Sequence, residues 1–144
     1  MRKLYTVLSV LLLSAVAAFA APPDLQASKI QPFPKTLNNA RYVYVTAYDG
    51  GQFNVNLLPD DRQAISAVQD AIQRWGKYII VYRPEEADMI IAVQSRPSED
   101  VMAVYDAHLK SSTYLWRAMG RDGLQQGETP LVSQLQQAVE KAGK

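Results

Sequence analysis

Apolar residues recur at every second position in several short stretches of the chain. In residues 41–48, Val43, Val45 and Ala47 alternate with three tyrosines and a threonine, which is typical of a half-buried strand. The run at residues 88–94 is apolar on both sides and favours a central strand. Further strands are predicted at residues 78–82, 101–106 and 113–119.

One longer stretch between these strands has helical periodicity. Its apolar stripe is formed by Ile65, Val68, Ile72 and Trp75. Pro59 precedes the helix, and Asp60 or Asp61 is expected to cap its first free N–H groups. Gly76 is expected to end it, because glycine enters the left-handed conformation without a penalty from a Cβ atom.

A second helix is predicted at the C-terminal end. Thr129 is expected as its N-cap, with Pro130 at the first helical position and Gly143 at the end. Its apolar stripe is formed by Leu131, Val132, Leu135, Ala138 and Val139.

The order of the elements, β-α-β-β-β-β-α, predicts the fold class. We expect an α+β domain, a two-layer sandwich of one mostly antiparallel sheet of about four or five strands with two helices on one face. This domain is predicted to span residues 41–144. Residues 21–40 contain four of the eight prolines and no periodicity, so they predict an extended N-terminal arm.

Residues 1–20 have the pattern of a secretory signal peptide. Arg2 and Lys3 precede an apolar run, and Ala18-Phe19-Ala20 supplies the small residues that a signal peptidase requires. A retained membrane anchor is the alternative, but the apolar run is short for a span of about 20 residues. We therefore expect an exported protein, periplasmic or extracellular, with no stable membrane anchor after cleavage.

The composition argues against several classes of function. The chain has no cysteine, which excludes a lipidated N-terminal cysteine, disulfides and thiolate chemistry. Removing Arg2 and Lys3 leaves 13 basic against 14 acidic residues, with no basic run, so nucleic acid is not an expected partner. No phosphate-binding glycine motif follows the Gly50-Gly51 pair, and we expect no cofactor.

Two adjacent runs carry a resemblance to a known group of proteins. Residues 75–81 read WGKYIIV, and residues 86–91 read EADMII. The pair resembles a pattern in exported bacterial proteins, in which a helix ends in a glycine and a basic residue and two strands follow. Residues 104–106 (VYD) and 115–117 (LWR) also resemble parts of this pattern.

The chain is thus similar, over about residues 41–142, to uncharacterised families of small secreted proteins or lipoproteins. It is more distantly similar to the N-terminal domain of TolB and related envelope-assembly proteins. The resemblance implies an α+β domain of the bacterial cell envelope. The lipoprotein members carry a lipidated cysteine that this chain lacks.

Aromatic residues occupy the strand positions opposite the aliphatic ones. If the aliphatic face packs on the helices, the other face gathers Tyr42, Tyr44, Tyr48, Tyr78, Tyr82, Tyr105, Tyr114 and Trp116. Rings with polar tips suit recognition surfaces, although tyrosine also suits a half-exposed sheet face without any function. We hypothesise a platform for an envelope protein, a glycan or an oligomer mate, with the candidate binding residues Tyr42, Tyr44, Tyr82, Tyr105 and Trp116.

Catalysis has one candidate pair, Asp106 and His108. In a strand these two residues would share a face, and a small hydrolase or metal-dependent enzyme would use them. His108 is the only histidine, and no nucleophile motif of the GxSxG type is present, so a solvated loop histidine is the simpler interpretation. We expect no metal and no catalytic residue. A structural, oligomer-forming protein that pairs through a sheet edge is a third hypothesis.

Overall fold

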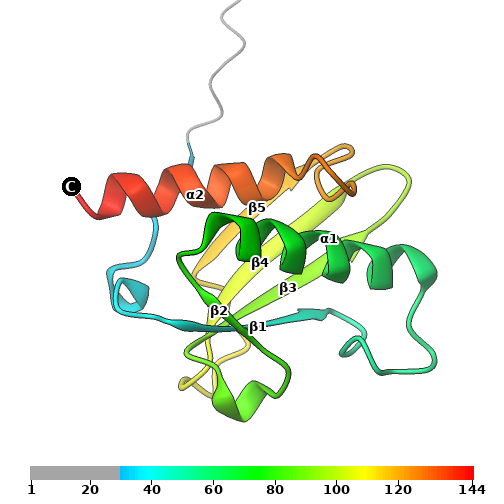
Figure 1. Ribbon diagram of the computed structural model, residues 1–144, viewed down its shortest axis with the longest axis horizontal. Coiled ribbons are helices and arrows are strands. Elements are labelled where there is room, and N and C mark those ends of the chain that lie inside the picture. Colours follow the sequence, from blue (N-terminus) through cyan, green and yellow to red (C-terminus); the bar gives the residue numbers. More distant parts are fainter. Residues whose placement is uncertain (1–29) are drawn as a thin grey trace, which may run out of the picture.

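The computed structural model describes residues 30–144, which form one five-stranded sheet with two α-helices on one face (Figure 1). The predicted signal peptide and residues 21–29 of the predicted arm lie outside the described residues. The elements are the 3-10 turn η1 (Lys35–Leu37), β1 (Tyr42–Ala47), α1 (Pro59–Trp75), β2 (Ile79–Val81), the 3-10 turn η2 (Pro84–Glu86), β3 (Met89–Ser95), β4 (Asp100–Asp106), β5 (Trp116–Gly120) and α2 (Pro130–Ala142). The predicted α+β fold and its order of strands and helices are confirmed.

The sheet is mixed rather than mostly antiparallel. Its strand order is β2-β1-β3-β4-β5; β1 pairs in parallel with both β2 and β3, whereas β3–β4 and β4–β5 are antiparallel. The prediction of antiparallel pairing is wrong for β1–β2 and β1–β3, and the path of the chain gives the physical reason. Helix α1 carries the chain back across the sheet before β2, as a parallel pairing requires. Strand β2 has only three residues, so residues 82–88 suffice to return the chain to the start of β3.

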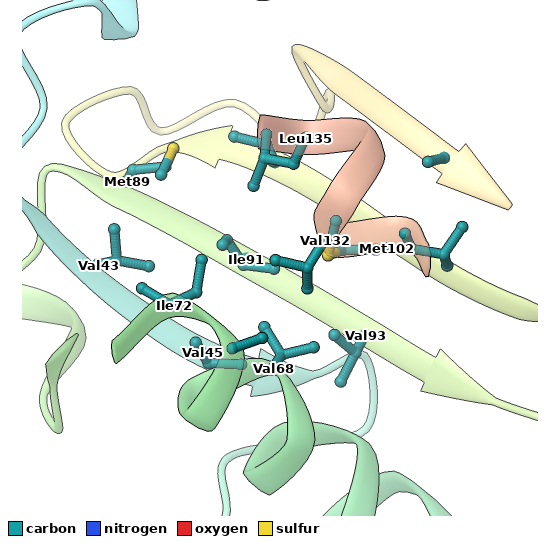
Figure 2. Packing of buried hydrophobic residues seen from close by; sticks show 14 of the residues in the cluster. Val43, Val45, Val68, Ile72, Met89, Ile91, Val93, Met102, Val132 and Leu135 are labelled. Carbon is teal, nitrogen blue, oxygen red and sulfur yellow. The ribbon is translucent and has the colours of Figure 1, made fainter. Parts of the chain in front are cut away.

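One face of the sheet and the two helices enclose the hydrophobic core. Helix α1 contributes Ile65, Val68 and Ile72, α2 contributes Leu131, Val132 and Leu135, and the strands contribute Val43, Val45, Met89, Ile91, Val93, Met102 and Val104. Figure 2 shows the labelled side chains of both helices pointing into the same layer as those of the strands. Each large aliphatic side chain buried there contributes about 1.5–3 kcal/mol relative to an exposed one.

The start of α1 differs from the prediction. The N-cap residue is Leu58, and no side chain caps the helix. Asp61 is instead buried, because its carboxylate accepts hydrogen bonds from the Ser95 backbone N–H and the Arg96 guanidinium. The predicted end is confirmed, since Gly76 has φ 76° and donates its N–H to the carbonyl of Ile72.

The described part of the predicted arm belongs to the domain. Phe33 and Leu37, which precede the predicted start of the domain at residue 41, are buried in the hydrophobic core. The backbone carbonyl of Gln31 accepts the indole N–H of Trp116 at 2.9 Å. The side-chain amide of Gln31 accepts the Arg117 backbone N–H and donates to the Leu115 carbonyl, so it covers the outer edge of β5.

Candidate functional site

Within residues 30–144, no helix covers the second face of the sheet, which we call the open face. Strand register places its side chains in three rows: Tyr44, Ile90 and Tyr105; Thr46, Ala92, Ala103 and Arg117; Gln94, Val101 and Met119. The rows combine phenols, an amide and a guanidinium with small apolar residues. Such a surface offers both apolar contact area and hydrogen-bonding groups.

A groove of about 340 Å³ lies on the open face. It is lined by Tyr48, Gln94, Val101, Tyr105, Tyr114 and Arg117. Beside it, Ala103 is fully buried although no helix lies above it. The longer side chains of the neighbouring rows must therefore cover this alanine.

Arg117 supplies the positive charge of the groove. Its guanidinium carbon lies 5.6 Å from the centre of the Tyr114 ring, within the range of a cation–π contact. Arg117 takes part in none of the ion pairs formed among residues 30–144. The guanidinium thus keeps donors for a ligand while the aromatic ring orients it.

Tyr48 keeps its phenol proton in this setting. Burial raises the pKa of Tyr48 from 10.0 to about 12, and the neighbouring Tyr105 phenol adds to the rise. The charge of Arg117 acts in the opposite direction but is a smaller effect. At neutral pH the phenol is therefore uncharged and can both donate and accept a hydrogen bond.

Three of the five predicted binding residues lie on the open face. Register places Tyr42, Tyr44 and Tyr105 there, and Tyr105 lines the groove. Tyr82 follows the last residue of β2 and is exposed, but it does not line the groove.

The prediction that Trp116 lies on the same face as the tyrosines is wrong. Trp116 pairs with Val104 on the helix-covered face and is only 1% exposed. The prediction assumed that alternation runs through residues 113–119, but β5 begins only at Trp116. Tyr114 lies in the preceding loop and reaches the groove from there, so the two aromatic residues do not share a face.

Tyr78 is also not on the open face. It precedes β2, is buried in the core and packs edge-on against Trp75 with ring centres 5.2 Å apart. Gln94, Val101 and Arg117 are the groove residues that sequence reasoning missed. Placing Trp116 on the aliphatic side of its strand would have assigned Arg117 and Met119 to the open face.

Asp106 and His108 do not sit side by side on a strand. Strand β4 ends at Asp106, whose carboxylate accepts the backbone N–H of His108 at 2.9 Å. The exposed imidazole instead lies 3.3 Å from Asp88. The backbone N–H groups of Arg41 and Tyr42 donate to Asp88 and are the main reason that the pKa of Asp88 is lowered. Residues 30–144 contain no group of three or more His, Asp or Glu residues that could hold a metal ion.

A cluster of buried polar groups lies at the end of β3. The Ser95 backbone and Arg96 bind the Asp61 carboxylate, and the Ser95 hydroxyl donates to Asp100 at 2.7 Å. Asp100 also accepts the backbone N–H of Leu124. Both carboxylates are thus satisfied from within the protein, and the cluster ties α1 to β3, β4 and the loop before α2. A hollow of about 400 Å³ adjoins it.

Comparisons with known proteins give no match. No protein-family model, no curated protein and no solved structure matches the chain. In the part of the chain that the structure describes, no helix has the length and apolar character needed to cross a membrane.

Proposed function

We propose that this chain is an exported, non-enzymatic binding domain of the bacterial cell envelope that holds its partner on the open face of its sheet. The observation that carries the proposal is the groove around Arg117. It combines three tyrosines, an amide and a cation without an ion pair among the described residues. Export and the envelope location rest on the signal-peptide pattern and on the resemblance of residues 41–142.

The geometry of the face suits an extended partner. The groove lies across β3, β4, β5 and the loop before β5, where a chain can contact several rows of side chains at once. Tyrosine rings offer a large contact area at a small cost in conformational entropy, and their hydroxyl groups add directional hydrogen bonds. A protein segment or a glycan strand presents matching apolar and polar edges, and Arg117 favours one with a carboxylate or carbonyl group.

Capture from an envelope extract tests this proposal. The chain from Ala21 onward is compared with a triple variant, Tyr105→Ala/Tyr114→Ala/Arg117→Ala, which removes two rings and the cation. The matched control is Tyr82→Ala/Leu109→Ala/Lys110→Ala, which removes a ring, an aliphatic side chain and a cation at exposed positions outside the groove. We expect the control to retain its partner and the groove variant to lose it at least tenfold.

Unfolding curves of both variants serve as the check on folding. Protease treatment of the extract separates the two kinds of partner, because it abolishes capture of a protein and spares capture of a glycan. Equal recovery of the same partner by the groove variant, the control and the unchanged chain would contradict open-face binding.

A further inference from the structure

The loop between β1 and α1 displays two apolar side chains to solvent. Phe53 is 77% exposed and Val55 is 88% exposed, the highest values among the large hydrophobic residues of the described chain. Leu57, in the same loop, is buried in the core and anchors it. Exposed apolar residues gathered on one loop indicate a contact site more strongly than isolated ones do.

This loop is held in a fixed conformation. The Arg62 guanidinium donates to the carbonyls of Gln52 and Asn54, the second at 2.9 Å. The Asn54 side chain donates to the Asp49 carbonyl, and the Gln69 amide donates to the Gln52 side chain at 2.9 Å. Little conformational freedom remains to be lost when Phe53 and Val55 meet a partner, which favours binding.

An apolar groove lies at the other end of the molecule, between residues 30–35 and α2. It has a volume of about 230 Å³ and is lined by Ile30, Gln31, Pro32, Phe33, Lys35, Ala138, Lys141 and Ala142. Small-molecule sites are usually larger, about 300–1,000 Å³. The groove therefore has the size for one or two apolar side chains.

The two features lie at opposite ends of the longest dimension. In Figure 1 the β1–α1 loop is at the right-hand end, whereas η1 and the C-terminal end of α2 are at the left-hand end. The loop cannot reach the groove of its own chain. It can reach the groove of a second copy placed along the same axis.

We propose that this chain binds a second copy of itself head to tail, with Phe53 and Val55 of one copy in the groove between residues 30–35 and α2 of the next. The charges beside the two features agree with this pairing. Asp60, in the first turn of α1 two residues after the loop, and Lys35 and Lys141, at the groove, form no ion pair among the described residues, whereas the Arg62 guanidinium is bound by carbonyls of the loop itself. The acidic group of one copy can thus approach the basic groups of the next.

The contact joins two different surfaces at opposite ends of the molecule, so copies placed along one axis cannot close it into a symmetric dimer. A head-to-tail contact leaves one loop and one groove free at the ends and repeats until a ring closes or a filament grows. Complexes larger than a dimer are therefore expected. The contact uses no residue of the open-face groove, so it stands or falls independently of the proposed partner binding.

A mixing experiment with two blocked variants tests the proposal. The loop variant, Phe53→Asp/Val55→Asp, has an intact groove. The groove variant, Ala142→Glu, has an intact loop and a longer, charged side chain at a partly exposed position of the groove. Light scattering across a concentration series gives the molar mass of each, and circular dichroism shows whether each is folded.

The unchanged chain is expected to grow beyond a dimer as its concentration rises, and each variant alone is expected to stay monomeric. Their equal mixture is expected to reach twice the monomer mass and no more, because only one loop–groove contact can form. Leu109→Asp, an exposed apolar position elsewhere, should associate like the unchanged chain. An unchanged chain that stays monomeric at every concentration, or a mixture that stays monomeric, would overturn the proposal.

Discussion

The two faces of the sheet are built by alternate residues of the same strands, yet they meet different surroundings. On one face Val43, Ile91 and Val104 lie under helices α1 and α2 and are fully buried. On the other face the neighbouring residues Tyr44 and Tyr105 remain partly exposed. The covered face is aliphatic because it must exclude water, whereas the open face has rings with polar tips that tolerate water and can still bind.

This comparison separates residues that hold the fold together from residues that are available for recognition. Substitutions on the covered face should act on the free energy of unfolding. Substitutions in the open-face groove should act on partner binding and leave the fold nearly unchanged. Each of the following experiments tests one part of that division.

The largest effect is expected for Trp116→Ala. Trp116 is fully buried on the covered face, so the cavity should lower the free energy of unfolding by about 3–5 kcal/mol. Tyr114→Ala removes an exposed ring of the groove. This substitution should change the free energy of unfolding by only about 0.5 kcal/mol. Urea denaturation of both variants measures the difference. Similar losses of stability for the two variants would mean that Tyr114 on the open face contributes as much to stability as the buried Trp116.

A smaller effect is expected for Ala103→Leu on the open face. Ala103 has no accessible surface, so a larger side chain must displace the side chains that cover it. Overpacking of this kind costs about 1–3 kcal/mol when the surroundings are well packed. Met119→Leu, at an exposed position of the same face, is the control and should be neutral. A neutral Ala103→Leu in thermal unfolding would show that the rings of the open face move aside freely.

The sequence determines much of this division but not all of it. Alternation placed Val43 and Tyr44 on opposite faces correctly, and Gly76 marked the end of α1. The alternation pattern failed at Trp116 because it applies only within a strand. Strand β5 starts between Tyr114 and Trp116, and no local signal marks that start. Asp60 or Asp61 is the cap that the local sequence predicts. The actual partner of Asp61, Arg96, lies 35 residues away and leaves no local signal.

The parallel pairing of β1 was missed for a similar reason. Strand direction depends on where α1 and the turn after β2 return the chain, and the residues of the strands do not encode it. The same holds for Arg117, whose role in the groove depends on residues from β3, β4 and the turn after β1.

Unfolding at alkaline pH tests one tyrosine in the core and one in the open-face groove. Burial raises the pKa of Tyr78, in the core, and of Tyr48, in the open-face groove, from 10.0 to about 12. Between these values the folded state binds more protons than the unfolded state, so stability present below pH 10 falls as the pH rises towards 12. In unfolding curves measured across this window, Tyr78→Phe should show a shallower decline. An unchanged decline would mean that the Tyr78 phenol ionises as readily in the folded as in the unfolded state.

The smallest effect is expected at Asp88, which lies before β3 and outside the groove. Its hydrogen bonds from the Arg41 and Tyr42 backbone lower its pKa below the ordinary 3.8, so its stabilisation is present above that pH and lost as the pH falls through the lowered value. Asp88→Ala should cost about 1 kcal/mol at neutral pH and flatten the acid limb of the stability curve. It should leave partner capture unchanged. A loss of capture would place the binding site at the His108 turn instead.

Footprinting of the tyrosines tests the central claim most directly. The folded chain is exposed to hydroxyl radicals alone and in complex with the envelope fraction that it captures, and mass spectrometry gives the oxidation of each tyrosine. Open-face binding predicts that Tyr105 and Tyr114 become protected, whereas Tyr82, which is exposed outside the groove, reacts equally in both samples. Protection of Tyr82 together with unchanged oxidation of Tyr105 and Tyr114 would contradict it.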